Sequence, residues 1–405
     1  MSFSNLSVEI TNSLTKEAKK NHGIFFTPPE VIKKNVDFLN IMGFLKTDTI
    51  VLEPSCGSCE YISEIKRYKP QSIKAIEFNK IIYDKIKHFE GEIDNMSIDN
   101  IDFLNYTPVQ APTLIIGNPP YFVMKKADVS RDYYKYFNGR PNIFILFIIK
   151  SLKILAADGI LSFILPKNFL NCSYYNATRE YIYNAFKIID ITECENGTYL
   201  DTQQPTIRFI VQKTKYNNEA YVIKKLLPKF TIFNTKSNIL ELNKLYEKSK
   251  SLYELGFKVS VGNVVWNQCK HILTTDTSKT RLIYSADIKN NTLIIANFKN
   301  PKKKNYINKQ GNNDMLLITN RGYGKGKYTF NCCIVDISES YLLENHVISV
   351  KYTKEIEKQE LKTKYKTIID SFNNKNTKKF IDLYIGNSAL NTTELGHILP
   401  IYNCN

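Results

Sequence analysis

Short apolar runs alternate with amphipathic stretches through the first half of the chain. Helical periodicity is expected over residues 31–39, 60–68, 144–156 and 177–186. Seven strand-like runs separate these stretches: Thr49–Glu53, Ser72–Glu77, Ile101–Leu104, Thr113–Gly117, Ile160–Leu165, Lys187–Ile191 and Thr206–Val211. Strands that alternate with helices predict an α/β fold with a doubly wound, mostly parallel seven-stranded sheet.

The pattern changes beyond about residue 215, where helical periodicity gives way to short β-like runs separated by Asn, Lys and Gly. These runs are Val259–Trp266, Leu293–Asn297, Met315–Thr319, Tyr328–Val335 and His346–Lys351. We therefore expect two domains, an α/β domain over residues 1–215 and a mainly β or mixed domain over residues 216–405.

One strand-like run ends abruptly in Asn118-Pro119-Pro120-Tyr121. Proline has no backbone N–H to donate, so two prolines end the strand and stiffen the turn that follows it. Asn118 offers an amide oxygen, the proline carbonyls have spare lone pairs and Tyr121 supplies a flat ring. Such a turn suits the binding of a planar amino group, although a stiff connection after a buried strand explains it equally well.

Small residues follow the first expected strand at Pro54–Cys59, and a helix-like stretch comes next. Strand, small-residue turn and helix form the first unit of a doubly wound sheet, which binds ligands at the carboxyl ends of its strands. Glu77 ends the second strand about 20 residues later, where an acid can hold the hydroxyls of a ribose. A surface acid at a strand end is the alternative interpretation. Thr27 and Glu30 have the spacing of a helix capping box.

Charge is distributed unevenly along the chain. The formal net charge is +16, of which roughly +3 falls before residue 216 and roughly +13 after it, which points to a polyanionic partner or to a lysine-rich surface kept for solubility. Two basic stretches, residues 299–304 and 321–327, are candidate phosphate-contacting loops, with exposed hairpin loops as the alternative. Their candidate DNA-binding residues are Lys302, Lys303, Arg321, Lys325 and Lys327.

Eight cysteines at uneven spacing indicate reduced thiols rather than a disulfide framework. Cys56 and Cys59 form a CxxC, but no second CxxC follows at zinc-ribbon distance, so we expect no metal site. The most apolar run, residues 143–155, is too short to span a bilayer and contains two lysines. We expect a cytoplasmic protein with no membrane association.

Taken together, these segments resemble the γ-class amino-methyltransferases of DNA, the restriction–modification group typified by the Taq-type adenine enzyme. The similarity covers about residues 20–213 and follows the motif order of that class. It starts with residues 26–30, continues through Glu53–Ser58, Glu77 and Asp102-Phe103, and reaches the catalytic motif Asn118–Tyr121. Two positions depart from the family pattern: Cys59 replaces a second glycine, and Tyr61-Ile62 replaces an aromatic-leucine pair.

The resemblance implies S-adenosylmethionine as cofactor and duplex DNA as substrate. The residues that it implies for the cofactor are Thr27, Glu53, Ser55, Cys56, Gly57, Glu77, Phe78, Asp102, Phe103, Asn118 and Phe147. It assigns catalysis to Asn118, Pro119, Pro120 and Tyr121, with Tyr199 stacking on the extruded base. We also expect DNA contacts from Lys125 and Lys126, in a charged mobile loop over the site at residues 125–140, and from Trp266 in the family-like stretch 261–267.

The expected activity is sequence-specific methylation of the N6 amino group of a flipped-out adenine by a monomeric enzyme, with a separate restriction endonuclease as a further partner. Four alternatives stay open: N4-cytosine methylation of DNA, methylation of RNA, methylation of protein glutamine, and a DNA-binding module with an inactive methyltransferase fold. The chain could come from a bacterium or from a virus acting in its host cell.

Overall fold

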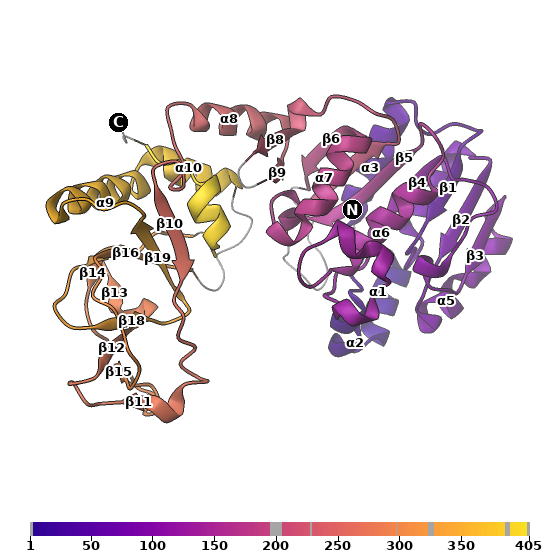
Figure 1. The fold of residues 1–405 in the computed structure, drawn as a ribbon. Helices are drawn as coiled ribbons and strands as arrows, with labels where there is room; N and C mark the ends of the chain where they lie inside the picture. The colour runs from indigo at the N-terminus through magenta and orange to yellow at the C-terminus, as the bar shows by residue number, and fades with distance from the viewer. Residues whose placement is uncertain are drawn as a thin grey trace. The chain divides into compact units, whose positions relative to one another are not determined.

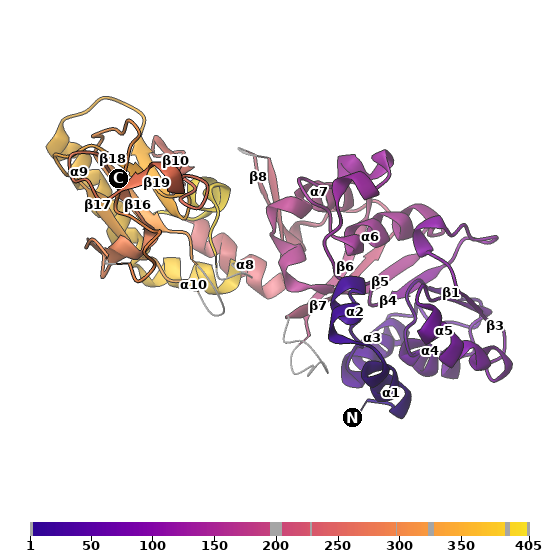
Figure 2. The same cartoon turned by 90° about the horizontal axis from the view of Figure 1, so that it is seen from below.

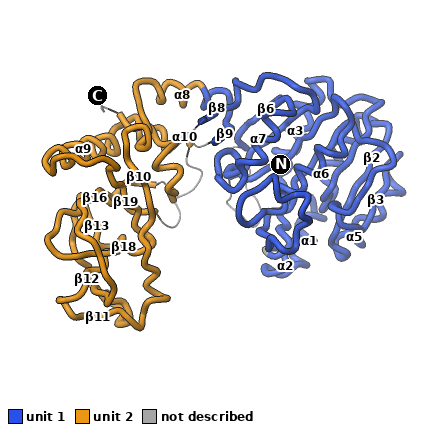
Figure 3. Tube along the Cα trace, viewed as in Figure 1, with its two compact units in different colours: residues 1–239 blue, residues 240–405 orange. Residues whose placement is uncertain are grey.

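In the computed structural model, residues 3–194, 205–226, 229–296, 298–322, 328–384 and 389–402 are described. Two compact units make up the chain, unit 1 at residues 1–239 and unit 2 at residues 240–405 (Figure 3). Among the described residues, no helix is both long and apolar enough to cross a bilayer.

Unit 1 is built on a seven-stranded sheet in the order β3-β2-β1-β4-β5-β7-β6 (Figure 1). Neighbouring strands are parallel except at β7, which runs antiparallel to both β5 and β6. The strands are β1 (Ile50–Glu53), β2 (Ser72–Ile76), β3 (Met96–Asp99), β4 (Leu114–Gly117), β5 (Ile160–Pro166), β6 (Lys187–Glu193) and β7 (Thr206–Gln212). The doubly wound, mostly parallel fold expected from the sequence is thereby confirmed.

Helices cover both faces of this sheet, as the view in Figure 2 shows. They are α1 (Asn5–Ser13), α2 (Lys16–His22), α3 (Pro29–Ile41), α4 (Glu60–Ile65), α5 (Lys80–Ile86), α6 (Ile143–Ile154) and α7 (Asn176–Ala185). Side chains alternate along each strand, so Val51 packs with α3, α4 and α5, whereas Leu52 packs with α6 and α7.

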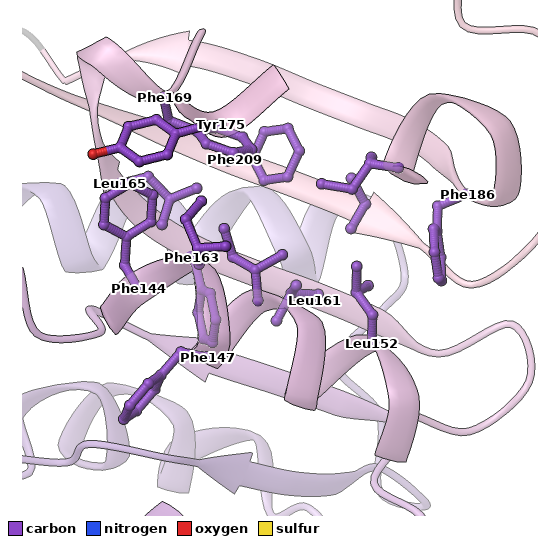
Figure 4. Packing of buried hydrophobic residues seen from close by; sticks show 14 of the residues in the cluster. Phe144, Phe147, Leu152, Leu161, Phe163, Leu165, Phe169, Tyr175, Phe186 and Phe209 are labelled. Atoms are coloured by element: carbon purple, nitrogen blue, oxygen red, sulfur yellow. The ribbon is translucent and has the colours of Figure 1, made fainter. Parts of the chain in front are cut away.

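The α6–α7 side of the sheet is rich in aromatic side chains (Figure 4). Phe144, Phe169 and Phe209 are fully buried there, and the Phe144 and Phe169 rings meet edge to face with their centroids 6.1 Å apart. Buried rings of this size bring large apolar areas into the core. This packing therefore holds α6 in place against the sheet. The first turn of α6 borders the site described below.

The third strand does not lie where the sequence suggested. We expected residues 101–104, but β3 is Met96–Asp99, and Phe103–Asn105 form a 3₁₀ turn, η3. At the edge of the sheet, β3 buries only Met96 and Ile98 and leaves the alternate side chains partly exposed. An edge strand with two apolar residues is easily missed beside a more apolar turn.

The boundary between the units lies at residues 239/240 rather than near residue 215. The intervening hairpin, β8 (Val222–Lys225) and β9 (Phe230–Phe233), packs on unit 1. Arg179 of α7 is buried there and donates to the Thr231 carbonyl over 2.6 Å. The hairpin is therefore part of the first compact unit.

The described residues of unit 2 form small sheets and three α-helices, besides short helical turns. An antiparallel sheet has the order β10-β19-β16-β17, a mixed sheet has the order β11-β15-β12-β18, and β13 pairs with β14. Their strands are β10 (Phe257–Val261), β11 (Leu273–Thr274), β12 (Thr280–Ile283), β13 (Ile288–Lys289), β14 (Thr292–Leu293), β15 (Tyr306–Ile307), β16 (Leu316–Asn320), β17 (Cys332–Val335), β18 (Tyr341–Leu343) and β19 (Val347–Tyr352). The helices are α8 (Lys236–Tyr246), which begins in unit 1, α9 (Lys358–Phe372) and α10 (Lys375–Tyr384).

The short β-strands expected for the second half of the chain are confirmed in part. Four expected runs overlap strands β10, β16, β17 and β19, but the run at 293–297 overlaps only the end of β14. The three helices were not expected from the sequence.

Candidate active site

The site lies where the order of the parallel strands reverses, between β1 and β4. Loops that leave the carboxyl ends of neighbouring strands diverge at such a point and leave a crevice. A cavity of about 270 Å³ occupies this position. It is lined by all eleven residues predicted to bind a cofactor and by Pro120. Pro119 and Tyr121 do not line it.

The loop after β1 keeps the backbone shape of a glycine-rich loop. Gly57 has φ +51°, and a Cβ atom added there would lie 3.1 Å from the Phe26 ring, which leaves little space for a side chain. Cys59 has φ +61°, a left-handed conformation that few non-glycine residues adopt. The family pattern has glycine at this position, so the cysteine preserves the turn at the cost of some backbone strain.

Two buried carboxylates stand at the strand ends. Glu77 accepts hydrogen bonds from the Gly57 N–H over 3.0 Å and the Asn79 N–H over 2.7 Å. Burial raises the pKa of Glu77 to about 7, and the two backbone N–H groups oppose the shift. Glu53 is 2% exposed, and burial, followed by the proximity of Cys59 and Glu77, raises its pKa well above the usual range. Its Oε2 atom has no hydrogen-bond partner.

Aromatic rings form another part of the wall. Asp102 accepts from the Leu104 N–H over 2.9 Å and so caps η3, which sets the Phe103 ring against Phe147 with centroids 4.9 Å apart. Phe78 lines the cavity while remaining 63% exposed. Apolar rings beside a buried acid suit a flat, polar-edged group such as a nucleobase.

The Asn118 carboxamide is oriented by groups from distant parts of the chain. Its Nδ2 donates to the Phe25 carbonyl over 3.0 Å, which fixes the other atom of the amide, Oδ1, as the acceptor on the opposite side. The Tyr121 hydroxyl lies within hydrogen-bond distance of Asn118 Oδ1 and of the Ile164 carbonyl, 2.7 Å away. Ser55 donates to the Asn118 carbonyl over 3.1 Å.

The first loop of the chain packs directly on this turn. A Cβ atom on Gly23, which has φ +62°, would lie 2.5 Å from the backbone nitrogen of Tyr121. Only glycine allows the two backbones to approach so closely. The segment that carries Thr27 is thereby joined to the Asn118–Tyr121 turn.

Several cavity-lining residues were not predicted from the sequence, among them His22, Phe26, Ser58, Glu60 and Phe122. Phe26 and Ser58 lie inside motifs that the sequence did single out, so motif membership was an available signal. His22, Glu60 and Phe122 had no such signal, because their position depends on how the chain packs.

The predicted loop over the site contains short helical turns and buried side chains. Residues 126–128 and 131–136 form 3₁₀ turns, and Val129, Tyr136 and Phe137 are buried. Lys125 and Lys126 are exposed, and the Lys126 ammonium lies 4.5 Å from the centre of the Tyr134 ring.

In unit 2, two adjacent lysines predicted to contact phosphate have different environments. Lys302 is exposed. The ammonium of Lys303 lies 4.1 Å from the centre of the Tyr284 ring, 4.2 Å from that of Phe298 and 5.7 Å from that of Trp266. Burial lowers the pKa of Lys303. Lys303 is therefore held inside an aromatic cluster instead of extending freely.

Arg321 is exposed. The predicted residues Tyr199, Lys325 and Lys327 lie outside the described residues. Among the described residues, no group of three or more His, Cys, Asp or Glu side chains could hold a metal ion, and the seven cysteines found there are free thiols.

The sheet order and the cavity at its reversal point match the seven-stranded methyltransferase sheet expected from the sequence. Residues 7–199 match the family model described as Eco57I restriction-modification methylase. Over nearly half of its length, the chain is therefore similar to the Eco57I restriction-modification methylases.

Known proteins similar to this chain include two from viruses of Chlorella. Type II methyltransferase M.CvrRI of Paramecium bursaria Chlorella virus XZ-6E is 27% identical over 357 residues, which span 86% of this chain and 88% of that protein. Modification methylase CviBIII of Paramecium bursaria Chlorella virus NC1A is 27% identical over 365 residues, with the same two coverages. Among solved structures, the type I restriction-modification system methyltransferase subunit from Streptococcus thermophilus is 20% identical, has a TM-score of 0.39, and is matched over 55% of this chain and 53% of that one.

The resemblance of the sequence implies S-adenosylmethionine as cofactor, and the cavity residues fit it. Glu77 can accept from the ribose hydroxyls, and the unpartnered Oε2 of Glu53 can accept from the amino group of the methionine moiety. Glu53, Glu60 and Glu77 all line the cavity. Carboxyl groups in this number complement a ligand that carries both a sulfonium and an ammonium charge.

Proposed function

We propose that this chain transfers a methyl group from S-adenosylmethionine to the N6 amino group of an adenine flipped out of duplex DNA. The observation that carries the proposal is the fixed orientation of the Asn118 carboxamide at the cavity wall. Because its Nδ2 is held by the Phe25 carbonyl, Oδ1 is available as an acceptor. Asparagine at this position favours adenine over cytosine, since the N4-cytosine enzymes more often have serine there.

In this proposal, the residues of the site mainly position the methyl donor and the adenine amino group. The cofactor supplies a methyl group already activated by its sulfonium. The amino nitrogen of adenine is a weak nucleophile because its lone pair is delocalised into the ring. Asn118 Oδ1 and the Pro119 carbonyl accept its two hydrogens, which lets the nitrogen become pyramidal and regain that lone pair. The same acceptors stabilise the positive charge that develops on the nitrogen.

Tyr121 has two roles in this proposal. Its hydroxyl donates to Asn118 Oδ1 or to the Ile164 carbonyl, since one hydrogen cannot serve both fully. An amide oxygen has two lone pairs, so Asn118 keeps one for the adenine amino group. The Tyr121 ring, with Tyr199, stacks on the extruded base and returns roughly 1–3 kcal/mol of the unstacking free energy.

Unit 2 is assigned to DNA recognition. The supporting observation is the basic surplus of unit 2, roughly +10 for residues 240–405 against roughly +6 for residues 1–239, together with exposed basic side chains such as Lys302 and Arg321. Lysine and arginine neutralise phosphates, and groove contacts select the sequence.

The direct test replaces Asn118 by alanine. Loss of the acceptor is expected to lower kcat by about 10²-fold or more, the loss typical for one donor or acceptor that stabilises developing charge. The dissociation constant for S-adenosylmethionine should change little. Tritium transfer to duplex DNA and isothermal titration calorimetry measure the two quantities.

Asn105→Ala is the matched control, because Asn105 is an exposed asparagine in the same unit and should retain full activity. Turnover by Asn118→Ala near the parent rate would refute the mechanism. Mass spectrometry of the nucleosides in the methylated product separates N6-methyladenine from N4-methylcytosine, and offering RNA or protein in the same assay tests the other substrates.

A further inference from the structure

The N-terminal helix α1 carries two serines that reach the wall of the cofactor cavity. Ser7 is fully buried, and its hydroxyl lies 2.6 Å from Glu60 Oε1 and 2.8 Å from the Ser58 hydroxyl. Ser4 caps α1 by accepting from the Ser7 N–H over 3.1 Å, and its hydroxyl also donates to Glu60. Ser58 and Glu60 both line the cavity.

The hydrogen-bond directions show how these groups depend on one another. Ser7 has one hydroxyl hydrogen, and the short contact assigns it to the Glu60 carboxylate. Ser7 then accepts from Ser58, which is 4% exposed. One buried hydroxyl therefore satisfies two polar groups of the cofactor loop at once.

Helix α1 is well anchored for this role. Ile10 is fully buried in the core that it shares with residues of α3 and α4, and Glu9 forms an ion pair with Lys85 of α5. A helix fixed on several sides can hold a partner side chain in one position.

We infer that α1 is part of the cofactor-binding machinery and that Ser7 is a positioning residue, which holds Glu60 and Ser58 in the cavity wall for S-adenosylmethionine. Glu60 then contributes a carboxylate charge next to Glu53 and Glu77. The inference concerns cofactor binding alone and stands whichever base is methylated.

The experiment compares Ser7→Ala, Glu60→Gln and the double variant with the parent chain. Hydrogen bonds to a charged group contribute enough that each single variant should weaken S-adenosylmethionine binding by roughly tenfold. The change in kcat at saturating cofactor should be smaller than the change in the dissociation constant, because neither residue is assigned a contact with the base. Because Ser7 acts through Glu60, the double variant should bind no more weakly than Glu60→Gln.

Ser13→Ala is the matched control. Ser13 lies on the same helix but donates to the Ile10 carbonyl over 2.8 Å, away from the cavity. Calorimetric titration gives the dissociation constants, and thermal unfolding of each variant without cofactor reports on folding. If Ser7→Ala fails to fold, Glu60→Gln still tests the link to the cofactor.

A charge readout separates this role from a merely structural one. Glu60→Gln should weaken binding of S-adenosylmethionine more than that of S-adenosylhomocysteine, which lacks the sulfonium charge. Equal losses for both ligands would contradict the role of Glu60. Binding by Ser7→Ala equal to that of Ser13→Ala, or additive losses in the double variant, would overturn the role of Ser7.

Discussion

At the scale of residues, the cavity is lined by buried acids that have no basic side chain beside them among the residues that the structure describes. Glu53 and Glu77 are 2% and 7% exposed, and taking a carboxylate out of water favours its neutral form. A bound cation or a set of hydroxyl donors reverses that preference. The protonation of these acids is therefore coupled to cofactor binding.

We expect cofactor affinity to depend on pH through Glu77. Its pKa is raised to about 7, so below pH 7 the free enzyme carries a protonated Glu77. Only the ionised carboxylate can accept from both ribose hydroxyls, hence a proton must leave on binding below this pH. The dissociation constant for S-adenosylmethionine should fall as pH rises toward 7 and then level off.

Calorimetry in two buffers of different ionisation enthalpy measures the released proton. The Glu77→Gln variant is the control, because it should bind more weakly but lose the inflection near pH 7. Proton uptake on binding, or affinity that is constant between pH 6 and 8, would contradict the role given to Glu77.

Residues of the site could be predicted from the sequence where they lie at the end of a strand. Glu77 and Asn118 could be located from the sequence because the carboxyl ends of parallel strands meet at one edge of the sheet. Lys303 shows the limit, since its run of lysines suggested an exposed loop and the structure holds its ammonium over aromatic rings. Ser7 shows the same limit, because nothing local in α1 indicates its contact with residues 58 and 60.

At the scale of elements, the hairpin β8–β9 is the clearest addition to the expected fold. Tyr221, Val222 and Phe233 are buried in the same core as α6 and α7. Asn218, just before the hairpin, accepts from the Ile188 N–H and donates to the Phe186 carbonyl, each over 2.8 Å. Sequence periodicity placed the sheet strands of unit 1 except β3, but it carries no information on which unit a short hairpin joins.

We expect the hairpin to be required for a stable catalytic unit. Burying each of its large side chains contributes roughly 1.5–3 kcal/mol, so a fragment of residues 1–215 loses several kcal/mol compared with residues 1–239. That loss is comparable to the total stability of about 5–15 kcal/mol of a typical domain. Thermal unfolding and S-adenosylmethionine binding of the two fragments measure the difference.

A third fragment, residues 1–239 with Phe233→Ala, is the graded control. Phe233 is fully buried, and its truncation should cost about 3–5 kcal/mol. If the fragment of residues 1–215 melts at the same temperature as the fragment of residues 1–239, the assignment of the hairpin to unit 1 is wrong.

At the scale of the whole molecule, the uneven distribution of charge predicts which unit makes DNA binding sensitive to salt. Counterions released from phosphates make DNA binding weaken steeply with salt, by about 10³–10⁵-fold between 50 and 200 mM when six to ten phosphates are contacted. If unit 2 makes most of these contacts, residues 1–239 alone should bind S-adenosylmethionine but show a shallower salt dependence and no sequence-specific methylation.

The adjacent lysines of unit 2 give this prediction a matched pair of variants. Lys302 is exposed and free to reach a phosphate, so Lys302→Ala should lower the slope of log affinity against log salt by about 0.9. Lys303 is occupied by the rings of Tyr284 and Phe298. Lys303→Ala should leave the slope unchanged and instead lower the unfolding temperature, because a cation held over aromatic rings contributes about 0.5–2 kcal/mol. Fluorescence anisotropy on a labelled duplex measures the slopes, and the opposite pattern in the two variants would show that the aromatic cluster opens to present Lys303 to DNA.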